Sequence, residues 1–384
     1  MSESIRDGVK REVALASAVR VGVDLAKRVI QVHAVDRAGK VLAARSLPRE
    51  RFEAWCRQLP AGCVVAMETC GGAHHWARRL RLSGLEVRLI AGHFVTPYRM
   101  QGKRGKNDAN DAAAICEAAS RPHMRFVPVK SAEQQAMLSV HRLREGWKEE
   151  RTACINRIRG LLAEFGRVFA QSPEALRAAL PGVLDDASNE LPEVARLALQ
   201  RALLHWIELD VHLAWCDERI TAHARADARA RAAMQLPGIG PITASALVAS
   251  VEDFEQFDDA RQFGSWLGLV PSQDSSGGKS KLGGVHKRGD AYLRTLLVQA
   301  ARSAVQTAHR RSDRLSRWLL GVRERRGWQK AAVALANKNA RIVWAILTRG
   351  ECFDPEHVAE APAAKRANSP AAAPAMAATP AMAG

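Results

Sequence analysis

The strongest constraint on the fold is a strand pattern that runs through residues 19–90. Apolar and polar residues alternate over 19–25 and again over 29–35, which is the period of a half-buried strand. The turn residues D-R-A-G-K then precede a third strand, V-L-A-A-R-S-L. Beyond it we expect a helix over 49–59, a strand over 63–68, a helix over 71–84 and a strand over 86–90. A strand meander followed by alternating helices and strands predicts an α/β layer fold with a central mixed sheet.

Changes in composition divide the chain into five segments. Residues 1–18 are expected to be a flexible arm, and residues 19–128 hold the α/β unit. In residues 129–228, apolar residues recur at helical spacing within charged segments, and Pro173, Pro181 and Pro192 break the pattern. This predicts two long helices in an antiparallel, coiled-coil-like pair. Residues 229–352 are predicted to be mostly helical with glycine-rich loops, and the Ala/Pro-rich residues 353–384 to be a disordered tail.

The charge of the chain indicates a polyanionic partner. Fifty-seven Lys and Arg residues against 40 Asp and Glu give a formal net charge of +17. Nucleic acid is the default partner for such a chain. A membrane is the rival, but no apolar run is long enough to span one. The first residues lack the apolar core of a signal peptide, so we expect a cytoplasmic, nucleoid-associated protein.

The seven cysteines predict neither a disulfide framework nor a zinc site. They are widely spaced and include no C-x-x-C pair. A metal cluster of Cys70, His74 and His75 is weakly supported, because its spacing is loose and no second pair follows. Buried or bystander thiols are the better interpretation.

Four carboxylates in the first third of the chain form the main candidate site. Asp24 and Glu68 each end a predicted strand, and Asp108 and Asp111 lie three residues apart on a predicted helix, where they share a face. Such a cluster would repel itself without cations. Two divalent ions, Mg²⁺ or Mn²⁺, would relieve the repulsion and support phosphoryl transfer. The alternative is structural, with Asp24 in a turn and Asp108 as a helix cap.

Three basic or glycine-rich segments are candidate nucleic-acid contacts. Lys103, Arg104 and Lys106 precede the acidic pair and could hold a phosphate backbone or lie in a solvated loop. Gly238 and Gly240 form a helix-hairpin-helix-like turn that could grip phosphate or simply be a packing corner. Residues 268–294 are rich in glycine and serine, and read either as a polyanion contact or as a solvated loop. Their cations are Lys279, Lys281, Lys287, Arg288 and Arg294.

The motifs V-D-L-A-K, M-E-T and K-N-D-A-N-D-A resemble the catalytic domain of bacterial DEDD transposases. That family is the insertion-sequence one-hundred-ten family, and the resemblance is to its eleven-eleven subgroup. It spans roughly residues 19–350. It implies a RuvC-like variant of the RNase H fold for residues 19–128. It also implies that Asp24, Glu68, Asp108 and Asp111 bind the metal.

The glycine- and serine-rich segment resembles the transposase domain of the same family, in which a serine before a glycine is catalytic. Here that serine is Ser276, with Ser275 as its near competitor. The resemblance implies a covalent serine–DNA phosphodiester and guidance by a structured non-coding RNA that pairs with element ends and target DNA. Whether the acids and the serine meet within one chain or between chains stays open.

Three functions are therefore compared. The leading one is a site-specific DNA recombinase that moves an insertion sequence. The second is a metal-dependent junction resolvase or nuclease that uses water as its nucleophile and does not need Ser276. The third is a non-enzymatic basic scaffold for nucleic acid. A recombinase cuts four strands, so we expect an even-numbered homo-oligomer, a dimer or tetramer.

Overall fold

The computed structural model describes residues 15–99, 108–276, 279–287 and 289–357. Several predicted features lie outside these residues: Lys103, Arg104, Lys106 and Arg288, most of the arm and most of the tail. The side chains of Asp108, Ser275, Ser276 and Lys279 lie outside as well. Among the described residues, no helix combines the length and the apolar character that crossing a bilayer requires.

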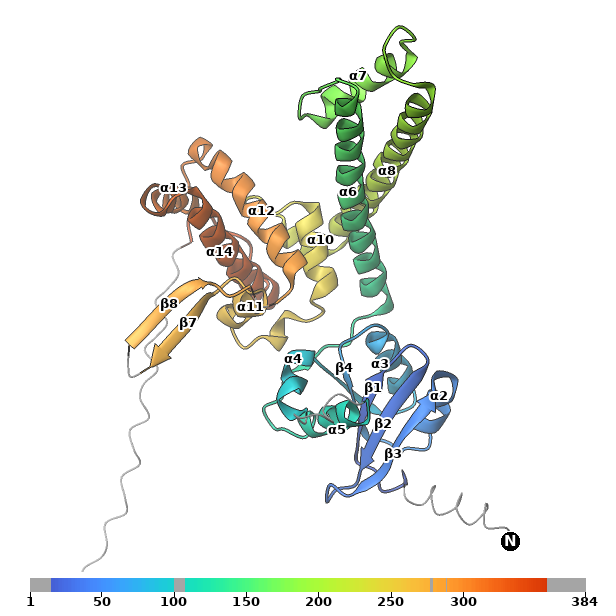
Figure 1. The fold of residues 1–384 in the computed structure, drawn as a ribbon. Helices are drawn as coiled ribbons and strands as arrows, with labels where there is room; N and C mark the ends of the chain where they lie inside the picture. Colours follow the sequence, from blue (N-terminus) through green and yellow to red (C-terminus); the bar gives the residue numbers. More distant parts are fainter. Residues whose placement is uncertain (1–14, 100–107, 277–278, 288, 358–384) are drawn as a thin grey trace, which may run out of the picture.

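A six-stranded mixed sheet forms the N-terminal part of the structure (Figure 1). Its order is β3-β2-β1-β4-β5-β6, with β1 parallel to β4 and β4 parallel to β5, and the other neighbours antiparallel. The predicted mixed sheet is therefore confirmed, and the short strand β6 was not predicted. The strands are β1 (Arg20–Leu25), β2 (Val29–Val35), β3 (Val41–Pro48), β4 (Val64–Glu68), β5 (Glu86–Ile90) and β6 (Phe126–Val127).

Helices cover both faces of this sheet. Helices α2 (Arg49–Cys56) and α3 (Ala73–Arg81) bury Phe52, Trp76 and Leu80 against one face. Helix α5 (Asp108–Ala118) packs on the other face, where Ile115 meets Ala66 of β4. The approach of α5 is close because Gly22 of β1 has no side chain. A Cβ at that position would lie 2.1 Å from the carbonyl oxygen of Ala112. Two short elements, α4 (Gly92–Val95) and η1 (Thr96–Tyr98), follow β5 and were not predicted.

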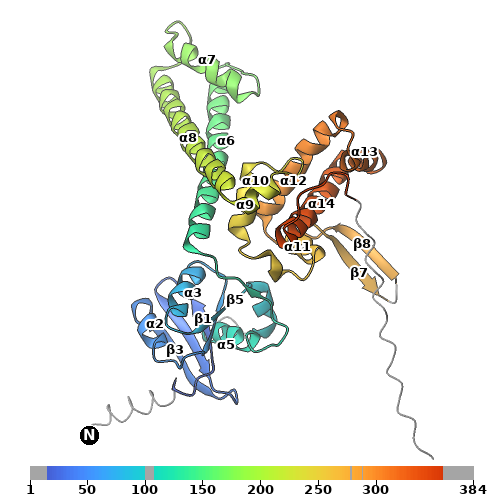
Figure 2. The same cartoon turned by 180° about the vertical axis from the view of Figure 1, so that it is seen from behind.

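Two long helices extend away from the rest of the molecule (Figures 1 and 2). Helices α6 (Ala132–Glu164) and α8 (Glu193–Ala226) pack along each other, with α7 (Pro173–Asp185) at their outer end. Pro173 begins α7 and Pro192 caps α8, as their predicted role as breaks requires. The expected break at Pro181 is wrong, because this proline lies inside α7.

The third part is a helical bundle with one β-hairpin. Its helices are α9 (Ala228–Ala233), α10 (Pro241–Ser250), η2 (Phe254–Gln256), α11 (Ala260–Trp266), α12 (Ala291–Thr307), η3 (Ala308–Arg310), α13 (Arg314–Arg326) and α14 (Trp328–Arg349). The glycine- and serine-rich segment, for which a flexible loop was one interpretation, pairs as strands β7 (Pro271–Ser276) and β8 (Lys279–Val285). The hairpin projects from the bundle (Figure 1).

A buried polar network joins the bundle to the long helices. His141 of α6 is 1% exposed, and its ring nitrogens each lie 2.9 Å from a hydroxyl, Nδ1 from Tyr292 and Nε2 from Ser245. The Ser245 hydroxyl also lies 2.9 Å from Nδ1 of His223 on α8. Helices α6, α8, α10 and α12 thus meet through hydrogen bonds, which satisfy polar atoms that folding removes from water.

Candidate active site

The period of the strands brings Asp24 and Glu68 to one face of the sheet. Side chains along a strand alternate between faces. Val21 and Val23 belong to the core under α2 and α3, so Gly22 and Asp24 face α5. By the same alternation Met67 faces α2 and α3, and Glu68 faces α5. Because β1 and β4 are parallel, both carboxylates stand at the same end of the sheet.

Asp111 reaches this end of the sheet from helix α5. It directly precedes Ala112, whose carbonyl oxygen is the atom that lies against Gly22. Asp108 is the first residue of the same helix, as the predicted three-residue spacing on a helix requires. The fold therefore brings Asp24, Glu68 and Asp111 to one location, which we call the acidic edge.

Arg99 connects two members of the acidic edge. Its Nη2 donates to Oε2 of Glu68 at 2.8 Å, and its Nε lies 2.9 Å from Oδ1 of Asp111. The second contact is an ion pair but not a hydrogen bond, since the buried Nε has no hydrogen-bond partner among the described residues. Sequence reasoning missed Arg99, because one arginine in a basic chain carries no distinguishing local pattern.

Two further neighbours define the surroundings of Glu68. A Cβ on Gly92 would lie 2.0 Å from Oε1 of Glu68, so a larger residue there would force this carboxylate to move. Burial raises the pKa of the Cys70 thiol, and the negative charges of Asp24 and Glu68 raise it further. Cys70 therefore stays a neutral thiol beside the acidic edge, and both acids lie close enough to affect it.

The suggested cluster of Cys70, His74 and His75 does not form a metal site. His74 accepts a hydrogen bond from the backbone N–H of Lys130 at 3.1 Å, and burial lowers its pKa to about 4. More broadly, within the described ranges no three His, Cys, Asp or Glu side chains converge as metal ligands. The side chain of Asp108, the fourth acid, lies outside the described residues.

The residues of the acidic edge nevertheless fit a divalent cation. Their donors are carboxylate oxygens, which hard cations such as Mg²⁺ prefer. A guanidinium already supplies positive charge between Glu68 and Asp111, and its Nε is held there without a directed hydrogen bond. The position between Glu68 and Asp111 therefore already holds positive charge. Glu68 and Asp111, which Arg99 already bridges, are the described pair that would hold a metal ion, with Asp24 at the end of the neighbouring strand. The three do not converge as metal ligands in the described part of the structure.

The structure does not bring the serine hairpin to the acidic edge. Ser276 is the last residue of β7 and pairs with Lys279 of β8. Both views show the hairpin on the bundle, apart from α5 and the sheet (Figures 1 and 2). Lys281 and Lys287 are exposed, and Lys287 has a positive φ of 56°. Arg294 instead donates to the carbonyl oxygen of Leu267 at 3.2 Å.

Of the two glycines in the turn before α10, only one is required by close packing. Gly238 has a φ of 84°, and a Cβ there would lie 2.0 Å from the carbonyl oxygen of Ala300 on α12. Gly240 caps α10 and its missing Cβ faces open space. The close contact accounts for Gly238 as a packing corner, whereas Gly240 has no such constraint.

Acids at the carboxyl end of a mixed sheet, in a strongly basic chain, are compatible with an enzyme that acts on nucleic-acid phosphate. Residues 21–166 match a model of the DEDD transposases of the IS110 type, and residues 230–316 match the family described as Transposase IS116/IS110/IS902. A Pseudomonas aeruginosa protein named "Probable family 20 transposase" is 50% identical over 88% of this chain and 98% of its own. The Coxiella burnetii "Transposase for insertion sequence element IS1111A" is 39% identical over 92% of this chain and 99% of its own.

The chain belongs to the IS110 family of DEDD transposases. It is therefore an insertion-sequence transposase, an enzyme that binds DNA. Family membership implies a RuvC-like fold for the sheet and dependence on a divalent metal ion.

Proposed function

We propose that this transposase cuts and rejoins DNA through Ser276, with Asp24, Glu68, Asp108 and Asp111 holding Mg²⁺. The observation that carries the proposal is the acidic edge, where Arg99 bridges Glu68 and Asp111 at the carboxyl end of the parallel strands and Asp24 ends the neighbouring strand. Bound metal would neutralise the charge that builds up on the phosphate during transfer.

The proposed domains are residues 19–128, 129–228 and 229–352, flanked by the arm and the tail, in a nucleoid-associated protein.

In the proposed reaction, the hydroxyl oxygen of Ser276 attacks a DNA phosphorus atom and its proton passes to a proton-accepting side chain or to water. A serine–phosphate bond forms while the bond to one DNA oxygen breaks, and that oxygen takes up a proton from water to become a DNA hydroxyl. A hydroxyl from another strand then attacks the serine phosphodiester, and the serine hydroxyl is restored. The phosphodiester count is unchanged throughout, so rejoining needs no energy source. The basic residues around the hairpin, Lys279, Lys281, Lys287 and Arg288, would hold the phosphate backbone.

The separation of the hairpin from the acidic edge supports a site built from two chains. In both views the two lie on different parts of one chain (Figures 1 and 2). We therefore propose that the acids of one chain act on DNA held by the serine of another.

Helix α8 offers a surface for self-association. Its buried residues, such as Trp206 and Leu209, pack toward α6. On its outer side Leu197, Leu204 and Val211 recur every seven residues and are 54%, 53% and 62% exposed. A heptad stripe left in solvent favours a second helix. We propose that this α8 stripe pairs with the same stripe of a second chain.

Guidance by a structured non-coding RNA is part of the proposal through the family resemblance, and the strongly basic composition is compatible with it. Sequencing the RNA that copurifies with the chain, expressed with its flanking element DNA, tests this point. A discrete RNA encoded beside the gene supports guidance. Unselected cellular RNA contradicts it.

The test of the serine mechanism is a covalent adduct. Wild-type protein, Ser276→Ala and Ser275→Ala, each with the RNA that copurifies with it, are incubated with labelled element-end DNA and Mg²⁺, then separated under denaturing conditions. The proposal expects a protein–DNA adduct with wild type and Ser275→Ala and none with Ser276→Ala. Loss of the adduct with Ser275→Ala alone would assign the reaction to Ser275. Cleavage without any adduct favours the water-using resolvase, and no metal-dependent cleavage at all favours the scaffold.

A further inference from the structure

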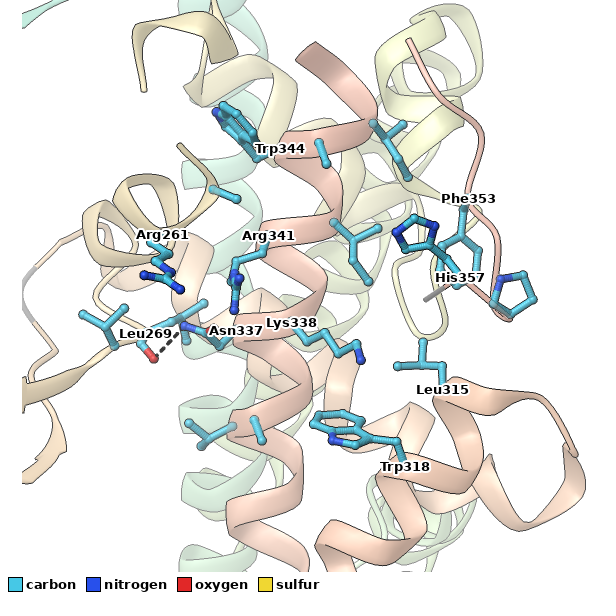
Figure 3. A pocket seen from close by; sticks show the side chains of 18 of the residues that line it. Arg261, Leu269, Leu315, Trp318, Asn337, Lys338, Arg341, Trp344, Phe353 and His357 are labelled. Atoms are coloured by element: carbon cyan, nitrogen blue, oxygen red, sulfur yellow. Dashed lines mark hydrogen bonds between the residues drawn. The ribbon is translucent and has the colours of Figure 1, made fainter. Parts of the chain in front are cut away.

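A large basic groove lies along α14, beside the hairpin but away from the acidic edge. Its volume is about 1590 Å³, and helix α14 forms its floor (Figure 3). One wall comes from Arg261 of α11 and the segment that leads into β7. The other comes from α13 and residues 351–357. This α14 groove is larger than the roughly 300–1,000 Å³ of small-molecule sites, so it suits a polymer segment.

The cations of the α14 groove have few opposing charges. Arg261, Arg314, Lys338 and Arg341 all line it, and no ion pair involves them among the described residues. Figure 3 shows Arg261 and Arg341 on one side of α14, with Lys338 on the other. Of the acids that line the groove, Glu351 already lies 4.0 Å from Arg349. Uncompensated like charges repel, and binding a polyanion would relieve this repulsion.

Lys338 is the most constrained of these cations. Its Nζ lies 4.4 Å from the centre of the Trp318 ring, a cation–π contact that fixes the ammonium inside the groove. Burial lowers the pKa of Lys338, and the positive charges of Arg314 and Arg341 lower it further. A half-buried lysine held on an aromatic ring among other cations is a preformed anion contact.

The groove continues into the hairpin that carries Ser276. Val270, Pro271, Gly284 and Val285, at the base of β7 and β8, belong to its lining. The side chain of Asn337 on α14 donates to the carbonyl oxygen of Leu269 at 3.1 Å, which ties this base to the groove floor. A polymer in the groove would therefore run toward the tip of the hairpin.

We propose that the α14 groove binds a single DNA strand next to the phosphate that the hairpin serine attacks, with Lys338, Arg341 and Arg261 pairing with its backbone. The choice of DNA rests on the proposed function, since the hairpin acts on DNA there. A flexible single strand can enter a recess that reaches Lys338.

The test measures binding of a fluorescein-labelled single-stranded oligodeoxynucleotide by anisotropy across a salt series. All variants carry Ser276→Ala, so binding is read without cleavage. The test variant is Lys338→Met with Arg341→Gln, because methionine keeps the apolar stem on Trp318. The matched control is Arg323→Gln with Arg326→Gln, which removes the same charge from the exposed end of α13 outside the groove. Thermal unfolding confirms that each variant is folded, and Arg261→Gln, an exposed single change, gives a second measure.

The proposal expects the slope of log Kd against log salt to change by about 1.4 in the test variant, since each phosphate contact on a single strand contributes about 0.7. At 0.1 M salt this corresponds to binding that is about 25-fold weaker, with about 5-fold for Arg261→Gln. The control should bind like the parent. Equal loss in test and control would overturn the proposal in favour of general basicity, as would no loss in either.

Competition with unlabelled duplex DNA and structured RNA identifies the occupant. If the test variant loses affinity for RNA but keeps its affinity for the single DNA strand, the groove is an RNA site and the proposal is overturned. The serine mechanism is tested separately by the adduct. A protein that binds as expected but forms no adduct when Ser276 is present refutes the serine and leaves the groove standing.

Discussion

Arg99 and Asp111 face each other at the acidic edge, with Nε of the arginine 2.9 Å from Oδ1 of the aspartate. The same guanidinium holds Glu68, so one side chain balances two of the acids. An arginine in this place keeps the carboxylates together when no metal is bound. It also competes with a metal ion for them.

Replacing Arg99 should therefore make the protein more dependent on metal. Without Mg²⁺, Arg99→Gln should lose about 1–2 kcal/mol of stability, the range for partly exposed charged contacts. With Mg²⁺ its melting temperature should rise more than that of the wild type, because no cation has to be displaced. Differential scanning fluorimetry with chelator and with Mg²⁺ measures both. The control is Arg88→Gln, which breaks the ion pair with Glu86 on β5. Equal Mg²⁺ responses in all three proteins would contradict the competition.

Gly22 should be intolerant of any side chain. Gly22→Ala places a methyl group 2.1 Å from the Ala112 carbonyl oxygen, so α5 must move off the sheet. We expect a loss of about 1–3 kcal/mol or more, as for overpacked cores. Gly71→Ala is the control, since its Cβ would meet nothing within 4 Å. Urea unfolding gives both values. Wild-type stability of Gly22→Ala would show that the helix packs less closely than described.

Acid should weaken the joint between the long helices and the bundle. Burial, together with the charges of His223 and Arg144, lowers the pKa of His141 to about 4, against an ordinary value near 6.5. Between these values the unfolded chain binds the proton and the folded chain does not, so stability falls as pH falls from about 6.5 to 4. The contribution is on the order of 3 kcal/mol.

The measurement is the melting temperature across this pH range for wild type and His141→Gln. His141→Gln removes this titration, so its stability should fall less steeply. His309→Gln, an exposed change on η3, serves as control. His74, whose pKa is also about 4, leaves a residual slope in every variant. Identical slopes for wild type and His141→Gln would contradict the role of His141.

The α8 stripe should set the oligomeric state. Leu204→Glu with Val211→Glu puts charges into the proposed helix pair and should shift the protein toward monomer. Multi-angle light scattering after size exclusion detects the change in mass. Leu82→Glu is the control, because Leu82 is 86% exposed but lies on the sheet part of the chain. An unchanged assembly in the double variant would place the interface elsewhere.

Local patterns predicted much of this fold. Strand alternation predicted β1 and β2, turn residues indicated the start of β3, and a short apolar run indicated β4. The sequence placed Asp24 and Glu68 at strand ends, and the structure adds that both face α5. The break at Pro181 was wrong because the surrounding helix packs well enough to continue through it. Arg99 and Gly22 could not be found from sequence, since both act through contacts with residues distant along the chain. The α14 groove was missed for the same reason: its cations come from α11, α13 and α14 and converge only on folding.

The distance between serine hairpin and acidic edge carries a consequence for the host cell. Under the proposed two-chain site, a solitary transposase that lands on a chromosome is inert, however firmly it binds. DNA cleavage then requires a second transposase molecule, so the rate of cleavage rises more steeply than the concentration of the protein. A mobile element of this kind would move rarely when its transposase is scarce. This limit would come from the structure of the transposase itself and would need no separate repressor.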